Sequence, residues 1–264
     1  MGHLRVTVAA LVAVALTSCQ FFGSSDASIV SFSLDGITVD ASIDPDARTV
    51  VVSAPPVDLS KISATIAVST GAELQSVPTF VDGVPTSVTL TAEDGTEVTW
   101  TVTVNLQLGV SFKLDGEWVF LLAGFVNTEN AEENEALGNG EPGASRAGSD
   151  LQVQVVRDVQ DVAVWYYPEA NYVWMDIYGF AVGTFTTVSD GDGDFYLYYV
   201  SDDESYFLSE GTIDVTHAAS SVGDLIVATF DALLEYNDGL FSADLTNGFM
   251  KLRRIADGVW SVPA

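Results

Sequence analysis

Alternating carboxylates in the sequence SDGDGD, at residues 189–194, are the sharpest chemical motif of this chain. Carboxylates at alternate positions of a glycine-rich loop can converge on a hard cation, and Ca²⁺ takes about six to eight oxygen ligands. Two positions depart from a standard calcium-binding loop: the sixth is Phe195 instead of glycine, and the twelfth is Ser201 instead of glutamate. The alternative is a plain Asp-Gly hairpin turn. The predicted calcium ligands are Asp190, Asp192 and Asp194.

A second candidate site is aromatic. The segments 162–167 and 172–178 flank the turn sequence PEAN at 168–171. A hairpin with this four-residue loop would place Tyr167 opposite Tyr172 and Trp165 opposite Trp174, whereas the other face, with Val173, Met175 and Ile177, is aliphatic and suits a core.

Flat aromatic surfaces of this kind can stack on the apolar faces of sugar rings, while neighbouring polar groups form hydrogen bonds. The alternative is that these aromatic side chains fill the interior between two sheets, since aromatic residues dominate such cores. The predicted ligand-binding residues are Trp165, Tyr167, Tyr172, Trp174 and Asp176.

Catalysis has little support in the sequence. His217 is the only histidine after the first few residues, and it follows a predicted strand, which indicates a solvated strand end. The chain lacks the G-x-S-x-G nucleophile motif and the phosphate-binding G-x-x-x-x-G-K-[ST] motif. After residue 18 the chain has one histidine and a single cysteine, Cys19, which leaves a zinc site without its usual ligands. We therefore predict a protein that is not an enzyme; a hydrolase that uses paired carboxylates is the weaker alternative.

The charge of the chain limits its partners. Its 264 residues contain 37 Asp and Glu against 9 Lys and Arg, a formal net charge of −28. Repulsion disfavours nucleic acid and anionic membrane surfaces as partners. The acidic residues are interpreted as a solvated coat, with cation binding as the alternative.

The N-terminus resembles the signal segment of bacterial lipoproteins. An apolar run from Val6 to Leu16 follows Arg5 and ends in Leu16-Thr17-Ser18-Cys19, which is similar to a lipobox. The resemblance implies that residues 1–18 are removed and that Cys19, the only cysteine, carries lipid. Gln20 in place of aspartate favours the outer membrane over the inner one. We expect residues 19–28 to be a tether, with the protein either periplasmic or exposed at the surface.

Hydrophobic residues alternate from Ile29 onward, which predicts an all-β fold. The clearest hairpin joins residues 87–92 to 97–104 through the turn sequence EDGT. Residues 31–104 also resemble an immunoglobulin-like domain of Bacteroidota-type surface lipoproteins that serve polysaccharide utilisation, on the sequences PPVDLSKISATIAVSTGAEL and TAEDGTEVTWTVTV. The resemblance implies a spacer or docking module over residues 29–106.

The second half of the chain is similar to a lipoprotein β-sandwich domain of unknown function. The similarity lies in five short sequences in order: DGEW, GTFTT, EGTIDVT, ATFDALL and LTNGFM. We therefore expect a second antiparallel β-sandwich over residues 110–258. Within it, residues 127–150 are rich in Glu, Gly and Ala, and are predicted to form a flexible acidic loop.

Together, these features predict a non-catalytic lipoprotein of the cell envelope with two β-sandwich domains. Its predicted role is a glycan-binding accessory of a polysaccharide-uptake system. The alternative is a structural or adhesion lipoprotein that contacts partner proteins of the outer membrane through its sheet edges. No cofactor is expected other than the candidate calcium.

Overall fold

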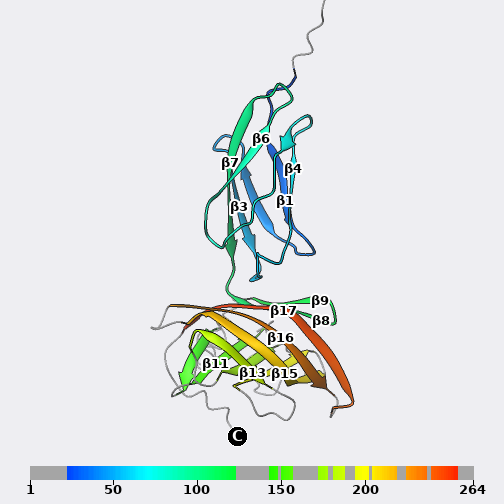
Figure 1. Ribbon diagram of the computed structural model, residues 1–264, viewed down its shortest axis with the longest axis vertical. Coiled ribbons are helices and arrows are strands. Elements are labelled where there is room, and N and C mark those ends of the chain that lie inside the picture. Colours follow the sequence, from blue (N-terminus) through cyan, green and yellow to red (C-terminus); the bar gives the residue numbers. More distant parts are fainter. Residues whose placement is uncertain are drawn as a thin grey trace, which may run out of the picture.

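The computed structural model describes residues 23–122, 143–147, 150–156, 172–177, 181–187, 194–201, 204–218, 224–236 and 239–254. Every regular element within these ranges is a β-strand. The strands form two units that follow one another along the longest axis (Figure 1). The predicted all-β class, with packed antiparallel sheets, is confirmed. Within the same ranges, no helix is long and apolar enough to cross a membrane.

The N-terminal unit consists of β1 (Ile29–Leu34), β2 (Asp40–Asp44), β3 (Thr49–Ala54), β4 (Ala64–Val68), β5 (Glu73–Leu74), β6 (Thr86–Thr91) and β7 (Glu97–Leu106). β1 pairs with β4, and the second sheet has the strand order β2-β3-β7-β6-β5. All of these pairs are antiparallel except β3 with β7. Apolar residues of both sheets meet in one core.

Side-chain alternation along β7 explains this packing. Trp100, Val102 and Val104 are almost fully buried, whereas the intervening threonines are exposed or half-buried, as a period of two predicts. The Nε1 of Trp100 donates a hydrogen bond of 3.0 Å to the carbonyl of Ala27. This bond satisfies the buried indole and attaches the start of the unit to its core.

The predicted hairpin of residues 87–104 is confirmed by the pairing of β6 with β7. Its turn is closed by local hydrogen bonds, because the Thr96 N–H donates to the Asp94 carboxylate and the Ala92 N–H donates to the Thr96 carbonyl, both at 2.8 Å. Gly95 has a φ of 85°, a left-handed conformation that glycine adopts without strain. The hydrogen bond from the Thr96 backbone lowers the pKa of Asp94 below its ordinary value.

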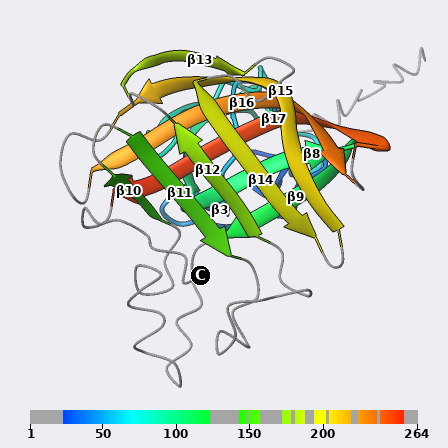
Figure 2. The same cartoon turned by 90° about the horizontal axis from the view of Figure 1, so that it is seen from below.

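The C-terminal unit consists of β8 (Gly109–Leu114), β9 (Glu117–Leu122), β10 (Gly143–Ala147), β11 (Asp150–Val156), β12 (Tyr172–Ile177), β13 (Gly183–Thr187), β14 (Phe195–Ser201), β15 (Glu204–His217), β16 (Leu225–Tyr236) and β17 (Phe241–Arg254). Its ten-stranded sheet has the order β10-β11-β12-β14-β15-β16-β17-β8-β9, with β13 paired to β15. β17 also pairs in parallel with β10. The sheet folds over into two layers, and β11, β12 and β14 cross in front of β16, β17 and β8 in Figure 2.

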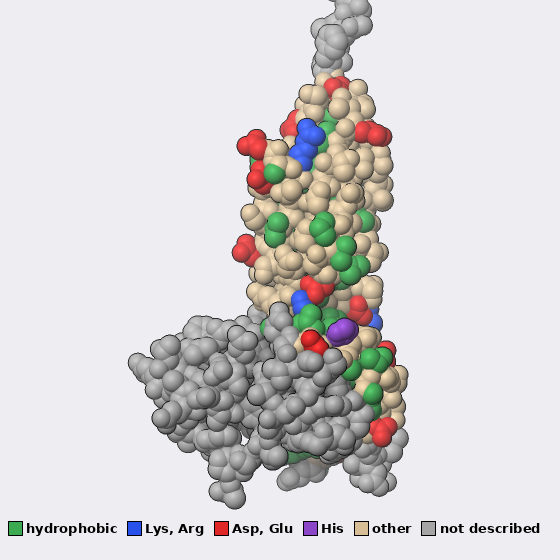
Figure 3. Space-filling model, turned by 90° about the vertical axis from the view of Figure 1, so that its left-hand side faces the viewer, with side chains coloured by type: hydrophobic (Ala, Val, Ile, Leu, Met, Phe, Trp, Pro, Cys, Tyr) green, Lys and Arg blue, Asp and Glu red, His purple; other side chains and the backbone are tan. Residues whose placement is uncertain are grey.

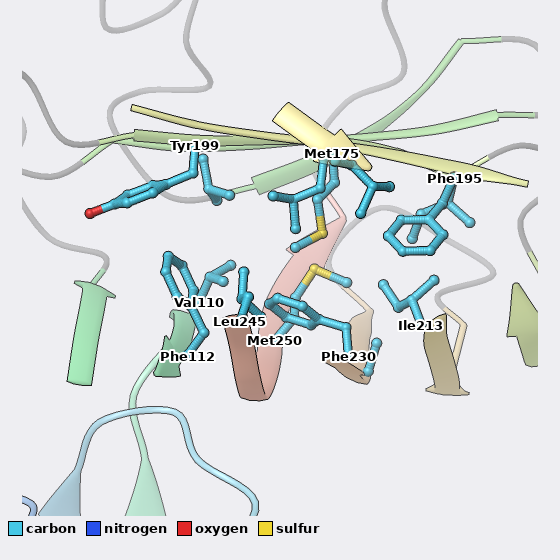
Figure 4. Close-up of a cluster of buried hydrophobic side chains, with 14 of the residues drawn as sticks. Val110, Phe112, Met175, Phe195, Tyr199, Ile213, Phe230, Leu245 and Met250 are labelled. Atoms are coloured by element: carbon cyan, nitrogen blue, oxygen red, sulfur yellow. The ribbon is translucent and has the colours of Figure 1, made fainter. Parts of the chain in front are cut away.

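The core of this unit lies between the two layers. Met175, Phe195 and Tyr199 extend from β12 and β14 toward Phe112 and Met250 of the opposite layer (Figure 4). All five are at most 2% exposed. Burial of a large apolar side chain contributes about 1.5–3 kcal/mol. This core therefore holds the two layers together and fixes the outward faces of β14 and β15.

The two units meet at β8, β9 and β17 (Figure 1). Lys251 forms an ion pair of 2.5 Å with Asp82 and donates a hydrogen bond of 2.7 Å to the carbonyl of Leu106. The Ser111 hydroxyl donates to the carbonyl of Pro56. Four apolar side chains of the C-terminal unit complete the N-terminal core: Trp118, Phe120, Val227 and Phe249. The junction is therefore a packed interface with polar contacts on it.

Part of the predicted loop 127–150 forms a strand in the structure. Gly143–Ala147 form β10, which pairs with the start of β11 at Asp150. The prediction was wrong for these residues because it rested on low apolar content, whereas ladder hydrogen bonds use backbone groups that every residue except proline possesses. Residues 127–142 and 148–149 lie outside the described residues.

Candidate functional site

The strand β12 has different neighbours from those expected for the aromatic hairpin. It pairs with β11 along one edge and with β14 along the other. A strand has two edges, so neither remains for residues 162–167. The predicted pairing of Trp165 with Trp174 is therefore wrong: the register partners of Trp174 are Gln154 and Tyr198. Strands that are more distant in the sequence replace the local hairpin partner.

The predicted aliphatic face of β12 is confirmed, because Val173, Met175 and Ile177 are completely buried. Of the five predicted ligand-binding residues, Tyr172, Trp174 and Asp176 occupy the alternate positions of this strand. Trp165 and Tyr167 lie outside the described residues. A role of these five residues in binding stays a prediction.

Next to β12, the outward face of β14 and β15 carries three aromatic side chains, Tyr196, Tyr198 and Phe207, which we call the aromatic face. The residues that alternate with them, such as Leu197 and Tyr206, belong to the core, so the three point away from it. Tyr198 and Phe207 are register partners, and their ring centroids lie 4.8 Å apart with the planes tilted by 40°. Phe207 is 47% exposed and Tyr196 is 36% exposed.

Hydrogen bonds hold the surroundings of the aromatic face in place. The Tyr198 hydroxyl donates to the Ser205 Oγ at 3.0 Å. The Ser209 hydroxyl donates to the Glu235 carboxylate at 2.8 Å, and Glu235 is the register partner of Phe207. The face thus combines flat apolar surface with hydroxyl and carboxylate groups, which is the composition that recognition of a polyhydroxylated ligand requires.

Aromatic rings on the core side of the same strands contact one another beneath the aromatic face. The ring of Tyr199 lies 5.0 Å from that of Phe112 and 5.6 Å from that of Tyr206. The Tyr206 hydroxyl donates a hydrogen bond of 2.6 Å to Glu204. Burial, and then this bond and the charge of Glu204, raise the pKa of Tyr206 above its ordinary range. Ring contacts and this hydrogen bond therefore hold Tyr206 in place on the core side of β15.

Sequence reasoning overlooked the aromatic face, although a signal for it exists. Residues 195–200 read FYLYYV, with four aromatic side chains in six positions, and residues 205–208 read SYFL after Asp202-Asp203. Two aspartates between runs of residues with high β-propensity are typical of a short hairpin connection. That hairpin is the β14–β15 pair, which joins Ser201 to Glu204.

The candidate calcium motif falls largely outside the described residues, because Asp190 and Asp192 are not among them. Asp194 is exposed, and its N–H donates a hydrogen bond of 2.9 Å to the carbonyl of Thr186. Within the described ranges, no group of three His, Cys, Asp or Glu residues is arranged to hold a metal ion. Calcium binding at Asp190, Asp192 and Asp194 stays a prediction.

The chain offers no other constellation for chemistry within the described residues. His217 is exposed at the end of β15, as predicted. A groove of about 300 Å³ in the N-terminal unit is lined by apolar residues, such as Leu59 and Phe80, together with serine and threonine, and none of its lining residues is titratable. General acid–base catalysis needs such groups. On the side seen in Figure 3, the acidic side chains of the N-terminal unit are scattered rather than gathered. Cys19 lies outside the described residues.

Comparisons with known proteins give little further guidance. No family model matches the chain, and no curated protein matches its sequence. A crystal structure from Bacteroides thetaiotaomicron, of a protein provisionally assigned as a glycoside hydrolase, is similar to this chain with a TM-score of 0.27 and 13% identity, over 85% of this chain and 89% of that one. A similarity at this level supports no inference about function, so the site has to be interpreted from its own residues.

Proposed function

We propose that this protein is a non-catalytic lipoprotein of the cell envelope, anchored by lipid at Cys19, that binds glycan through its aromatic face as an accessory of polysaccharide uptake. The observation that carries the proposal is the exposure of Tyr196 and Phe207 on a sheet face that lies over a packed core. Large aromatic side chains in this position give up part of the stabilisation that burial provides, and apolar surface gathered on one exposed face is typical of an interaction site.

The surroundings of the face also suit a sugar ligand. The ring of Phe207 offers an apolar surface for the C–H face of a pyranose, and Ser205, Ser209 and Glu235 offer partners for its hydroxyl groups. A tether at the N-terminus supports the same role, because it keeps the binding face at a high local concentration near an uptake channel.

A pull-down on insoluble polysaccharides, followed by a glycan array, tests this proposal. The Phe207→Ala variant should bind about tenfold more weakly than the wild type, as expected for the loss of one stacking ring. Phe241→Ala is the matched control, since Phe241 is 53% exposed but stacks with Tyr236, which packs against the core instead of the aromatic face. Failure of the wild type to bind any glycan, or equal losses in both variants, would contradict the proposal.

A structural or adhesion role through sheet edges is the second candidate. β4 pairs only with β1 among the described strands, and its sequence ATIAV contains neither a charge nor a proline. Natural edge strands usually carry such residues to prevent strand addition. Lys introduced at Thr65, which is exposed, should abolish capture of a partner protein in envelope cross-linking if this edge is the functional surface, and should leave glycan binding unchanged.

A further inference from the structure

Negative charge surrounds the aromatic face on more than one side. Glu235 is exposed and lies directly across the ladder from Phe207. Asp194 is exposed and lies immediately before β14, two residues from Tyr196. At backbone level, Asp176 is the register partner of Tyr196. The three aromatic residues therefore lie in a frame of carboxylate-bearing positions.

No basic residue offsets this charge within the strands that build the face. The sequences of β11, β12, β13, β14, β15 and β16 contain neither lysine nor arginine. Lys251 is engaged at the junction by Asp82 and the Leu106 carbonyl. Lys113 lies over the ring of Trp118 at 5.1 Å, on the β8–β9 hairpin. The strands that build the face therefore bring carboxylates to it and no lysine or arginine.

From this combination we infer that the ligand of the aromatic face carries ammonium groups, as a glycan built of amino sugars does. The inference rests on the proposed glycan binding and narrows its ligand class. Two interactions favour an ammonium group at such a surface. The carboxylates attract its charge, and the faces of the tyrosine and phenylalanine rings attract it through cation–π interactions. A polysaccharide of uronate or sulfate units is repelled by the same charges.

The aromatic residues and the carboxylate of Glu235 have different roles in this inference. Phe207 and Tyr196 supply stacking surface, which any pyranose with an apolar face can use. Glu235 supplies charge selection, and the hydrogen bond from Ser209 holds its carboxylate beside the ring of the register partner Phe207. Removal of the charge should therefore weaken only cationic ligands, whereas removal of the ring should weaken neutral and cationic ligands alike.

Calorimetric titration of the full chain with oligomers of glucosamine, N-acetylglucosamine and galacturonate tests this assignment. Glucosamine oligomers should bind most tightly, N-acetylglucosamine oligomers more weakly, and galacturonate oligomers not measurably. Only the glucosamine affinity should fall as salt is raised, because salt screens exposed charges. Glu235→Gln keeps a hydrogen-bond acceptor for Ser209 and should reduce the glucosamine affinity by about two- to fivefold, as expected for one exposed ion pair.

Glu97→Gln is the matched control, because Glu97 is an exposed glutamate of the N-terminal unit that also accepts one side-chain hydrogen bond, from Gln75. It should leave every affinity unchanged. Equal binding of glucosamine and N-acetylglucosamine oligomers, with no effect of Glu235→Gln, would overturn charge selection while leaving glycan binding intact. Absence of binding to all three oligomers and to the polysaccharide panel would overturn the proposed function itself. Tighter binding of a lysine oligomer than of any glycan would replace the glycan by a basic peptide and would overturn both.

Discussion

Two sheet faces of this chain point outward from a buried core, and they carry different types of residue. On the N-terminal unit, the face formed by β6 and β7 carries Ser87, Thr89, Thr99 and Thr101 as register partners. On the C-terminal unit, the face formed by β14 and β15 carries Tyr196, Tyr198 and Phe207. Both faces lie over a core of buried apolar side chains.

The two faces differ in whether β-strand formation alone explains their outward residues. Threonine has a high β-propensity and tolerates solvent, so the N-terminal face is explained by strand formation alone. The C-terminal face could be built in the same way, yet it exposes aromatic rings. This contrast between the two faces is what motivates the proposed binding role of the aromatic face.

The largest expected change is a loss of stability when Trp100, on the buried side of β7, is replaced. Trp100 is 1% exposed and its Nε1 donates to the Ala27 carbonyl. Trp100→Ala should lower the free energy of unfolding by about 3–5 kcal/mol, through the cavity and the lost hydrogen bond. Urea denaturation followed by circular dichroism measures this loss. A loss below about 1 kcal/mol would show that the unit does not depend on this core residue.

An exchange between the two faces should affect binding far more than stability. Phe207→Thr gives the aromatic face the residue type of the N-terminal face. The loss of the cross-strand contact with Tyr198 should cost at most about 1 kcal/mol of unfolding free energy, whereas glycan affinity should fall about tenfold. Parallel melting and binding curves measure both quantities. A fall in stability without a fall in affinity would assign Phe207 a structural role.

The smallest expected effect is on the pH dependence of stability, through Asp94 in the turn between β6 and β7. The Thr96 backbone N–H lowers the pKa of Asp94, so the charged carboxylate stabilises the folded state above the unfolded-state pKa. This stabilisation is lost as the pH falls through the lower pKa of the folded state. Asp94→Asn should therefore be slightly less stable than the wild type near neutral pH.

That difference should disappear in acid, below about pH 4, where the unfolded-state carboxyl becomes protonated and then the folded-state one. Urea midpoints of both proteins at neutral and acidic pH give the comparison. A difference that grows in acid would contradict the assigned direction of the pKa shift.

The sequence was most informative where side chains alternate over a local hairpin. The alternation that predicted the hairpin of residues 87–104 places Trp100, Val102 and Val104 on one face of β7, and all three are almost fully buried. The turn at Gly95 also followed from residue types, because a left-handed φ favours glycine. Such features depend on interactions between residues that are near in sequence.

Strand partners that are distant in sequence could not be predicted in the same way. Alternation determines which face a residue occupies but not which strand lies beside it, so the pattern of β12 correctly predicted buried Met175 and failed to predict β11 and β14 as neighbours. The parallel pairs of β3 with β7 and of β10 with β17 have no local signal either. The candidate site changed for this reason: Tyr198, instead of Trp165, is the register partner of Trp174.

Hydroxyl-radical footprinting tests the role of the aromatic face most directly, because the radical oxidises exposed aromatic rings. With a glucosamine oligomer at saturating concentration, oxidation of Tyr196 and Phe207 should fall several-fold, whereas oxidation of Phe241, which is exposed to a similar extent, should not change. Bound oligomer with unchanged oxidation of Tyr196 and Phe207 would contradict the account, and so would protection of Phe241 alone.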